Sequence, residues 1–244
     1  MASYLLLFLA VFLGGGLALL GNAKYLRAYL PYLLSFSGAF LLGIAALELI
    51  PEIFNHPKGQ PGIWLLAGFL LQLLLENLSQ GVEHGHIHSK RKASRSYGIG
   101  ILIGLCLHAF IEGLPLQSLD YEHYHVGHNH SHDLGRNLLV GVIMHKLPAA
   151  FALGLLLRFS DYSKRFVIGG LSVFALMAPL GAWLGGIFIL EPVWIESTLA
   201  LVVGSLLHIS TTILFEADAR RHHSVSWQKL VVIVVGLGVA LVSV

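Results

Sequence analysis

Two residues that could hold a metal ion stand four positions apart in an apolar stretch of the sequence. They are His108 and Glu112, within residues 107–117, LHAFIEGLPLQ. In an α-helix, residues at this spacing project from one face, one turn apart. An imidazole and a carboxylate are costly inside a bilayer unless they meet a partner, water or an ion. The pair is therefore a candidate for a metal site or a proton relay.

A second apolar segment supplies a matching histidine. Residues 137–157 carry His145, Lys146 and Pro148 in mid-span, and Pro115 follows the first pair in a similar way. A proline inside a helix frees a backbone carbonyl and bends the axis. In a bilayer, a freed carbonyl is tolerated where it faces protein or a water-filled cavity. Two neighbouring helices would then share one polar site, although a plain kink is the alternative for each proline.

The composition indicates an all-α polytopic membrane protein with a single transmembrane domain over residues 1–244. The chain is 56% hydrophobic and 11% charged, with a mean hydropathy of +0.76, which is too apolar for a soluble domain. Cys106 is the only cysteine, which excludes a disulfide framework and a cysteine-based zinc module. Eight runs are long enough to cross a hydrocarbon core of ~30 Å. We expect these spans near residues 3–21, 31–50, 62–80, 97–117, 137–157, 165–188, 195–216 and 228–243. The first run is too long for the core of a signal peptide, so we expect it to remain as a span.

Basic residues are distributed unevenly among the connections between these runs. One set of alternate connections holds Lys24, Arg27, Lys90, Arg91, Lys92, Arg95, Arg158, Lys164, Arg165, Arg220, Arg221 and Lys229. The other set holds only Lys58 and Arg136. The positive-inside rule places the first set in the cytoplasm and both termini outside. Short loops favour a bacterial inner membrane.

Two connections are rich in histidine. We expect residues 81–96 to form a cytoplasmic loop and residues 118–136 a loop on the opposite side. Their histidines are His84, His86 and His88 in the first, and His123, His125, His128, His130 and His132 in the second. Such tracts bind borderline divalent cations through neutral imidazole. We interpret the longer loop as a weak metal-capturing segment, whereas for the shorter one a plain soluble linker is an equal alternative.

The other ionisable residues in the apolar runs are few. Glu48 lies at the external end of the second span and could line an access path. His208 is well inside the seventh span, where it is either hydrogen-bonded to a neighbouring helix or part of an exit path; Glu216, eight residues on, shares its face. Glu52 and Glu76 lie near helix ends, where we expect a solvated carboxylate.

Glycines punctuate several runs, and Gly181 and Gly185 are separated by three residues. Small residues at this spacing let membrane helices approach closely. We therefore interpret the glycines as packing sites and assign them no chemistry.

The chain resembles the ZIP family of zinc and iron permeases. The specific motifs are LHAFIEGLPLQ (residues 107–117) and HKLPAAFALG (residues 145–154). Supporting motifs are FLLGIAALELIPE (residues 40–52), LMAPLGAWLGG (residues 176–186) and GSLLHISTTILFEAD (residues 204–218). The resemblance implies eight helices in a 3+2+3 arrangement of inverted repeats and uptake of a divalent cation toward the cytoplasm. It also assigns His108, Glu112 and His145 as metal ligands.

The sequence departs from the family pattern at several positions. The family's fifth helix commonly reads His-Glu-x-Pro-His-Glu, but here Lys146, Ala149 and Ala150 stand at three of these positions. Ala109 replaces the usual Asn after the first His, and Ala178 replaces a Glu common in the sixth helix of bacterial members. Most ligands of a second metal are thus missing. We hypothesise a one-metal site in which Lys146 substitutes electrostatically for the missing ion and pairs with Glu112, so that metal binding competes with the ammonium.

Two imidazoles and one carboxylate suit Zn²⁺, with Fe²⁺, Co²⁺, Ni²⁺ and Cd²⁺ also feasible. The prediction is a zinc transporter working by alternating access through a site between the fourth and fifth helices. One alternative is a diverged homologue that senses a metal or carries another cation. A less favoured one is an intramembrane zinc hydrolase, because the sequence has no HExxH motif. We expect contact with membrane lipid and no nucleic acid partner; the oligomeric state is left open, a homodimer included.

Overall fold

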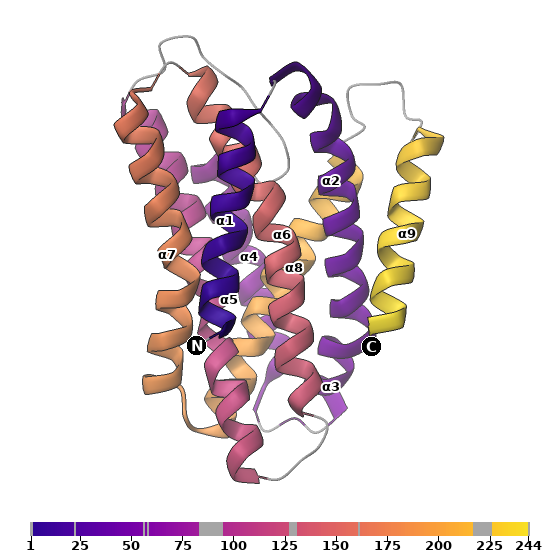
Figure 1. Cartoon of the computed structure of the whole chain (residues 1–244). Helices are drawn as coiled ribbons and strands as arrows, with labels where there is room; N and C mark the ends of the chain where they lie inside the picture. The colour runs from indigo at the N-terminus through magenta and orange to yellow at the C-terminus, as the bar shows by residue number, and fades with distance from the viewer. Residues whose placement is uncertain are drawn as a thin grey trace.

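The computed structural model describes residues 2–21, 23–55, 57, 59–82, 95–126, 131–160, 162–216 and 226–243, and their regular elements are all helices (Figure 1). The elements are α1 (Ala2–Leu20), α2 (Ala23–Ile44), the π-helix Ala45–Leu49, α3 (Ile50–Asn55), α4 (Pro61–Ser79), α5 (Arg95–Val126), α6 (Ser131–Phe159), α7 (Lys164–Phe188), α8 (Pro192–Glu216) and α9 (Trp227–Ser243). Each of the eight expected spans is helical, which confirms the all-α architecture.

Six helical segments of the described chain are long and apolar enough to cross a membrane, and two shorter apolar helices, Tyr4–Leu20 and Trp227–Ser243, accompany them. Both ends of the chain lie toward the lower side of Figure 1, at one end of the bundle. The connection from α1 to α2 and the start of α9 lie at the opposite, upper end. These are segments that carry basic residues, in agreement with the expected alternation of the loops.

The second span is not a regular α-helix throughout. A π-helix, Ala45–Leu49, interrupts it just before Pro51, and the Ile50 N–H donates to the carbonyl of Ala45. A proline cannot donate to the helix and crowds the carbonyl four residues earlier. One wider turn accommodates this disturbance, and such turns are frequent at functional sites. As a result, Glu48 lies in the π-helical turn.

The segment at residues 118–136, expected to be a loop, is largely helical where it is described. α5 continues to Val126, and α6 begins at Ser131. Between positions 118 and 126 the sequence contains neither glycine nor proline, so no residue there breaks the helix before Gly127. The two central helices are consequently longer than the apolar runs from which they were predicted.

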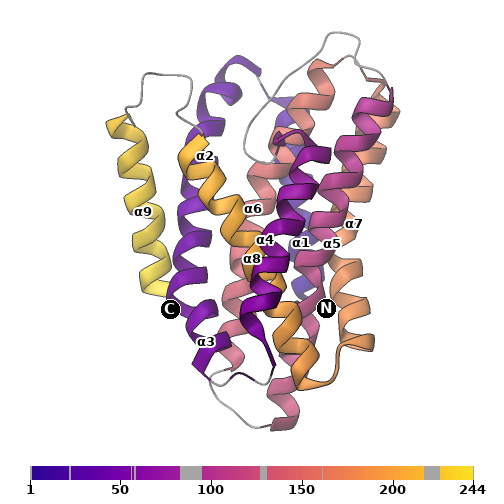
Figure 2. The same cartoon turned by 180° about the vertical axis from the view of Figure 1, so that it is seen from behind.

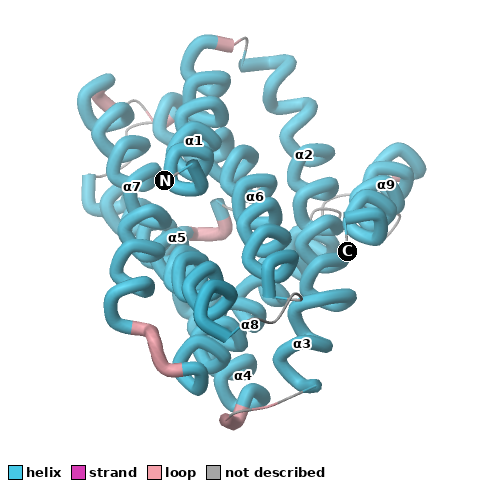
Figure 3. Tube along the Cα trace, turned by 60° about the horizontal axis from the view of Figure 1, so that its bottom comes forward, coloured by secondary structure: helices cyan, strands magenta, loops and turns pink. Residues whose placement is uncertain are grey.

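The spans pack in two groups, and α1, α5, α6 and α7 form the first while α2, α4, α8 and α9 form the second. The groups meet where α2 contacts α6, and where α4 and α8 contact α5. An inverted repeat would relate α1 to α7, α2 to α8, α4 to α9 and α5 to α6. Under this correspondence, the contact of α1 with α6 is equivalent to that of α7 with α5, and the contact of α4 with α8 is equivalent to that of α9 with α2. This is the relation expected for a 3+2+3 inverted repeat. Figure 3 shows α9 at the edge beside α2, with α6 in the interior.

Glycines bring the helices of each group into close contact, as predicted for Gly181 and Gly185. A Cβ added at Gly181 would lie 2.1 Å from the carbonyl oxygen of Phe110, and one at Gly185 would lie 1.9 Å from that of Leu114. Gly14 of α1 meets the carbonyl of Leu147 on α6 in the same way, at 2.2 Å. These contacts hold α7 and α1 directly against the two helices that carry the candidate metal ligands.

Candidate metal centre

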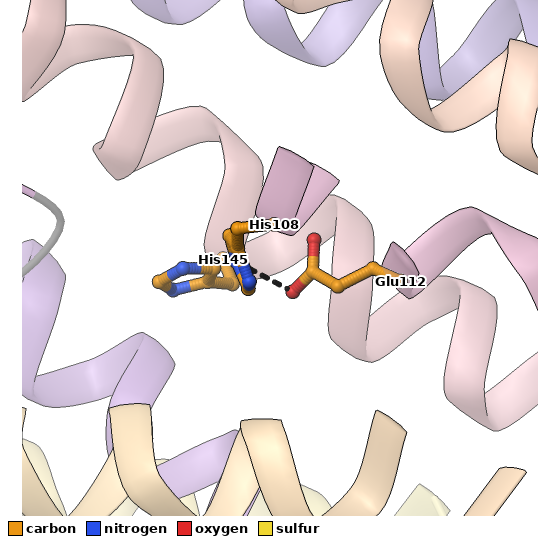
Figure 4. A group of neighbouring side chains, drawn as sticks. All are labelled: His108, Glu112 and His145. Atoms are coloured by element: carbon orange, nitrogen blue, oxygen red, sulfur yellow. Dashed lines mark ion pairs between the residues drawn. The ribbon is translucent and has the colours of Figure 1, made fainter. Parts of the chain in front are cut away.

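The three candidate ligands lie together in the interior of the first helix group. His108 and Glu112 project from α5 and His145 from α6, and one ligand atom of each lies within 4.8 Å of the others. The residues are 2%, 0% and 1% exposed, respectively. His108 Nε2 is 3.1 Å from Glu112 Oε1, and the two imidazole rings are nearly perpendicular with centroids 6.0 Å apart (Figure 4). The helical spacing thus brings His108 and Glu112 together, and packing adds His145.

Lys146 completes this cluster from the position next to His145. Its Nζ donates to Glu112 Oε2 at 2.7 Å, and the residue is 1% exposed. The same Nζ lies 5.5 Å from the centroid of the Phe174 ring on α7, within the range of a cation–π interaction. Glu112 therefore faces an imidazole with one oxygen and an ammonium with the other. This is the pairing expected from the sequence.

No second set of ligands surrounds the cluster at the positions where the family pattern would place it. Ala149, Ala150 and Ala178 are all buried, and their methyl side chains offer no donor atom. Two imidazoles and one carboxylate are the three-ligand set that leaves a fourth position of a tetrahedral Zn²⁺ for water or an exchanging ligand. The chemistry of the donor set therefore fits a single borderline divalent cation.

Asn137 connects the π-helix that carries Glu48 with α6 and with the end of α9. Asn137 Nδ2 on α6 lies 3.0 and 2.8 Å from the two oxygens of Glu48. The same nitrogen lies 3.3 Å from the backbone oxygen of Ser243 at the end of α9. Glu52 is exposed, as expected. The sequence did not indicate Asn137, which lies at the margin of its predicted span.

His208 on α8 contacts Glu76 on the neighbouring helix α4, a residue that we expected from the sequence to be solvated. Its Nε2 lies 2.6 Å from Glu76 Oε2 on α4, and the two side chains are 7% and 18% exposed. The interpretation of Glu76 as a solvated carboxylate at a helix end is therefore wrong, because the crossing of α4 and α8 brings the two together. Ser205 donates to Gln72 in the same seam, at 3.0 Å. Polar residues at helical spacing on both runs were the available signal.

The remaining candidates lie outside the described residues or at positions described by their backbone alone. His84, His86, His88, His128 and His130 lie outside the described residues. His123 and His125 belong to α5, His132 to α6 and Glu216 to the last position of α8, but the description there is limited to the backbone. The expectations of metal capture and of a pathway at these positions stay predictions.

Comparison with known proteins finds a family model, described as ZIP Zinc transporter, that matches residues 83–244. The chain is 34% identical to zinc transporter SLC39A7 from Sus scrofa over 28% of its length and 18% of that protein. It is 30% identical to zinc transporter ZIP9-B from Xenopus laevis over 49% of its length and 37% of that protein. It is 22% identical to zinc transporter ZIP1 from Danio rerio, over an alignment that covers 68% of this chain and 67% of that protein. The chain thus covers less than half of the first two relatives and about two thirds of the third.

Proposed function

Because the chain belongs to the ZIP zinc transporter family, we propose that this integral membrane protein transports a divalent metal cation, foremost Zn²⁺, toward the cytoplasm. The cation passes by alternating access through a site between α5 and α6. The single observation that carries this proposal is the buried cluster of His108, Glu112 and His145, whose candidate ligand atoms lie within 4.8 Å of one another. Three polar side chains of this kind in mid-span are costly unless they serve an ion or a proton path. Membership of the zinc transporter family also supports a role as a transporter rather than as an enzyme.

The centre binds one cation, with Lys146 at the position of a second. When no metal is bound, the ammonium compensates the charge of Glu112 across 2.7 Å. An incoming cation must share Glu112 with this ammonium, and two positive charges at close range in a poorly screened interior repel each other. Binding is consequently weaker than the ligand set alone would provide. Moderate affinity suits transport, because the ion must leave the site again.

The donor set also determines which other cations compete with Zn²⁺. Imidazole and carboxylate accept Fe²⁺, Co²⁺, Ni²⁺ and Cd²⁺, whereas Mg²⁺ and Ca²⁺ prefer a shell of oxygens. We propose the first four ions as alternative substrates. In this proposal, Glu48 lines the external part of the transport path, and His208 and Glu216 line its cytoplasmic part. The two histidine-rich segments capture metal at the two ends of the path.

The distribution of basic residues supports the orientation of the protein. Both termini are extracytoplasmic, and the segment at residues 81–96 is cytoplasmic, in a bacterial inner membrane. The basic ends of the helices contact anionic lipid, and no nucleic acid takes part. A homodimer is the assembly to test first.

The decisive experiment is uptake of radiolabelled Zn²⁺ into proteoliposomes that contain the purified protein. Saturable uptake by the wild-type chain should be lost in His108→Ala and in Glu112→Ala. Glu52→Gln is the matched control, since it removes an exposed carboxylate, and its uptake should equal that of the wild type. Stoichiometric metal binding without uptake would contradict transport and favour the sensor alternative, which the contact of Lys146 with Glu112 also allows.

A further inference from the structure

A second imidazole–carboxylate pair lies in the seam between α4 and α8. His208 Nε2 and Glu76 Oε2 are 2.6 Å apart, and both residues belong to the second helix group. The ring of Phe69 meets the His208 ring edge-on, with centroids 4.8 Å apart and an interplanar angle of 88°. This contact restricts rotation of the imidazole and keeps its Nε2 directed at α4. Figure 2 shows α4 and α8 crossing on the side of the molecule away from α1.

The depth of this pair follows from the packing of α4 against α5. A Cβ at Gly104 would lie 2.8 Å from the backbone nitrogen of Ser79 and 2.9 Å from the carbonyl oxygen of Leu75. The last turn of α4, which contains Glu76, is therefore level with Gly104. His108 lies one helical turn further along α5, a rise of roughly 6 Å. Measured along the α5 axis, the pair is thus about one turn from the level of the candidate metal centre, on the side where α4 ends and α5 begins.

The pair is more accessible than the centre. The side chains of His208 and Glu76 are 7% and 18% exposed, whereas those of His108 and Glu112 are 3% and 0% exposed. Just one turn away, Gln72 accepts a hydrogen bond from Ser205, so two more polar side chains line the same seam. The seam thus offers nitrogen and oxygen donor atoms, and the Glu76 carboxylate is the part of it that reaches the surface.

We propose that Glu76 and His208 form a second, transient binding site for the transported divalent cation, on the cytoplasmic side of the centre. The inference rests on the proposed function for the identity of the cation, and its donor set is of the same kind, one imidazole and one carboxylate. A tetrahedral ion held at about 2.0–2.2 Å by both atoms separates them to roughly 3.4 Å. The contact therefore opens by less than 1 Å when the ion binds, a movement that the partly exposed Glu76 side chain can make. Two protein ligands leave the other positions to water, which suits rapid release.

Equilibrium binding of Co²⁺ tests the site directly, because its visible absorption reports ligand number and type. The starting protein carries His108→Ala, Glu112→Ala, His145→Ala and Lys146→Met, so that no ammonium is left buried without a partner, and the eight histidines of the two histidine-rich segments are replaced by Gln. This protein should still bind one equivalent of Co²⁺ that disappears in Glu76→Gln and in His208→Gln. Asn77→Ala is the matched control, since Asn77 is an exposed neighbour on α4 that bonds its own helix, and it should leave this equivalent in place.

The proposed site is wrong if the bound equivalent of Co²⁺ persists in both Glu76→Gln and His208→Gln. It is also wrong if the starting protein binds no such equivalent of Co²⁺. The exchanged variant Glu76→His with His208→Glu guards against misfolding, because it preserves the ligand pair and should bind Co²⁺ again; absence of binding in this folded variant also overturns the site. In the otherwise wild-type chain, Glu76→Gln should lower the maximal rate of Zn²⁺ uptake about tenfold with little change in KM. Failure of transport by the wild type contradicts the proposed function, but it leaves the Co²⁺ result at this pair to be judged by itself.

Discussion

Two buried imidazole–carboxylate contacts in the same chain differ in what else touches the carboxylate. In the α5–α6 cluster, Glu112 faces His108 at 3.1 Å and Lys146 at 2.7 Å, and a second histidine lies close by. In the α4–α8 seam, Glu76 contacts His208 at 2.6 Å and remains 18% exposed. The first carboxylate is enclosed among positive or potentially positive groups, while the second keeps a route to the surroundings. The same two residue types therefore stand in different surroundings, set by enclosure and by the number of partners, and this difference is the basis for proposing that one cluster holds the cation and the other releases it.

The largest effect should come from removing the enclosed carboxylate. Glu112→Ala leaves the ammonium of Lys146 buried without its partner, which costs about 3–5 kcal/mol of folding free energy. Glu76→Ala, in the more exposed pair, should cost about 1–2 kcal/mol, as expected for one hydrogen bond. Thermal unfolding in detergent measures both changes. Adding Lys146→Met to Glu112→Ala should restore most of the lost stability without restoring uptake, and equal losses in the two single variants would contradict the difference in enclosure.

The second effect concerns the histidine that each helix seam places beside a carboxylate, His145 at the candidate centre and His208 next to Glu76. His145→Ala removes one of the three candidate ligands and should weaken Co²⁺ binding at the centre at least about 100-fold, beyond what loss of an outer hydrogen-bond partner does. His208→Ala should leave the affinity of the centre unchanged, because it lies in the other seam. Titration of Co²⁺ by its visible absorption distinguishes them. A weakened centre in His208→Ala would show that the two clusters act as one.

The third prediction isolates the charge of Lys146. Lys146→Met removes an ammonium that repels the incoming cation, so the dissociation constant for Co²⁺ at the centre should fall at least about tenfold, or 1.4 kcal/mol. Lys229→Met is the control, because Lys229 is also buried, at 4% exposure, but lies on α9. Its substitution should leave this dissociation constant unaltered. An unchanged affinity in Lys146→Met would end the hypothesis that this residue substitutes for a second ion.

The smallest effect should come from the aromatic rings beside each cluster. Phe174→Leu removes the ring below the ammonium of Lys146 and should cost about 0.5–2 kcal/mol of stability, the range of cation–π interactions. The loss should shrink once Lys146→Met is present, since no cation then faces the ring. Thermal unfolding of the two single variants and the double variant measures this coupling. Purely additive losses would mean that Phe174 contributes packing alone.

Much of the fold could be predicted because it depends on local patterns. Long apolar runs report spans independently of what packs around them, and the helical spacing of His108 and Glu112 is sufficient to put both on one face. The end of α5 was placed too early and the start of α6 too late, because hydropathy reports the apolar part of a helix and both helices continue through polar residues. A helix can continue through polar residues once it is nucleated, provided that no Gly or Pro interrupts it.

The positions of the helical spans, the residue types of the candidate ligands and the departure at Lys146 could all be read from the sequence. The packing of the helices was needed to show that Glu76 pairs with His208, that Asn137 donates to Glu48 and that Phe174 lies below the ammonium. Each of these contacts joins residues on different helices, more than 25 positions apart in the chain. They depend on which faces the helices present to each other and on how closely glycines let them approach. Those quantities arise when all the helices pack together, and no local pattern in the sequence carries them.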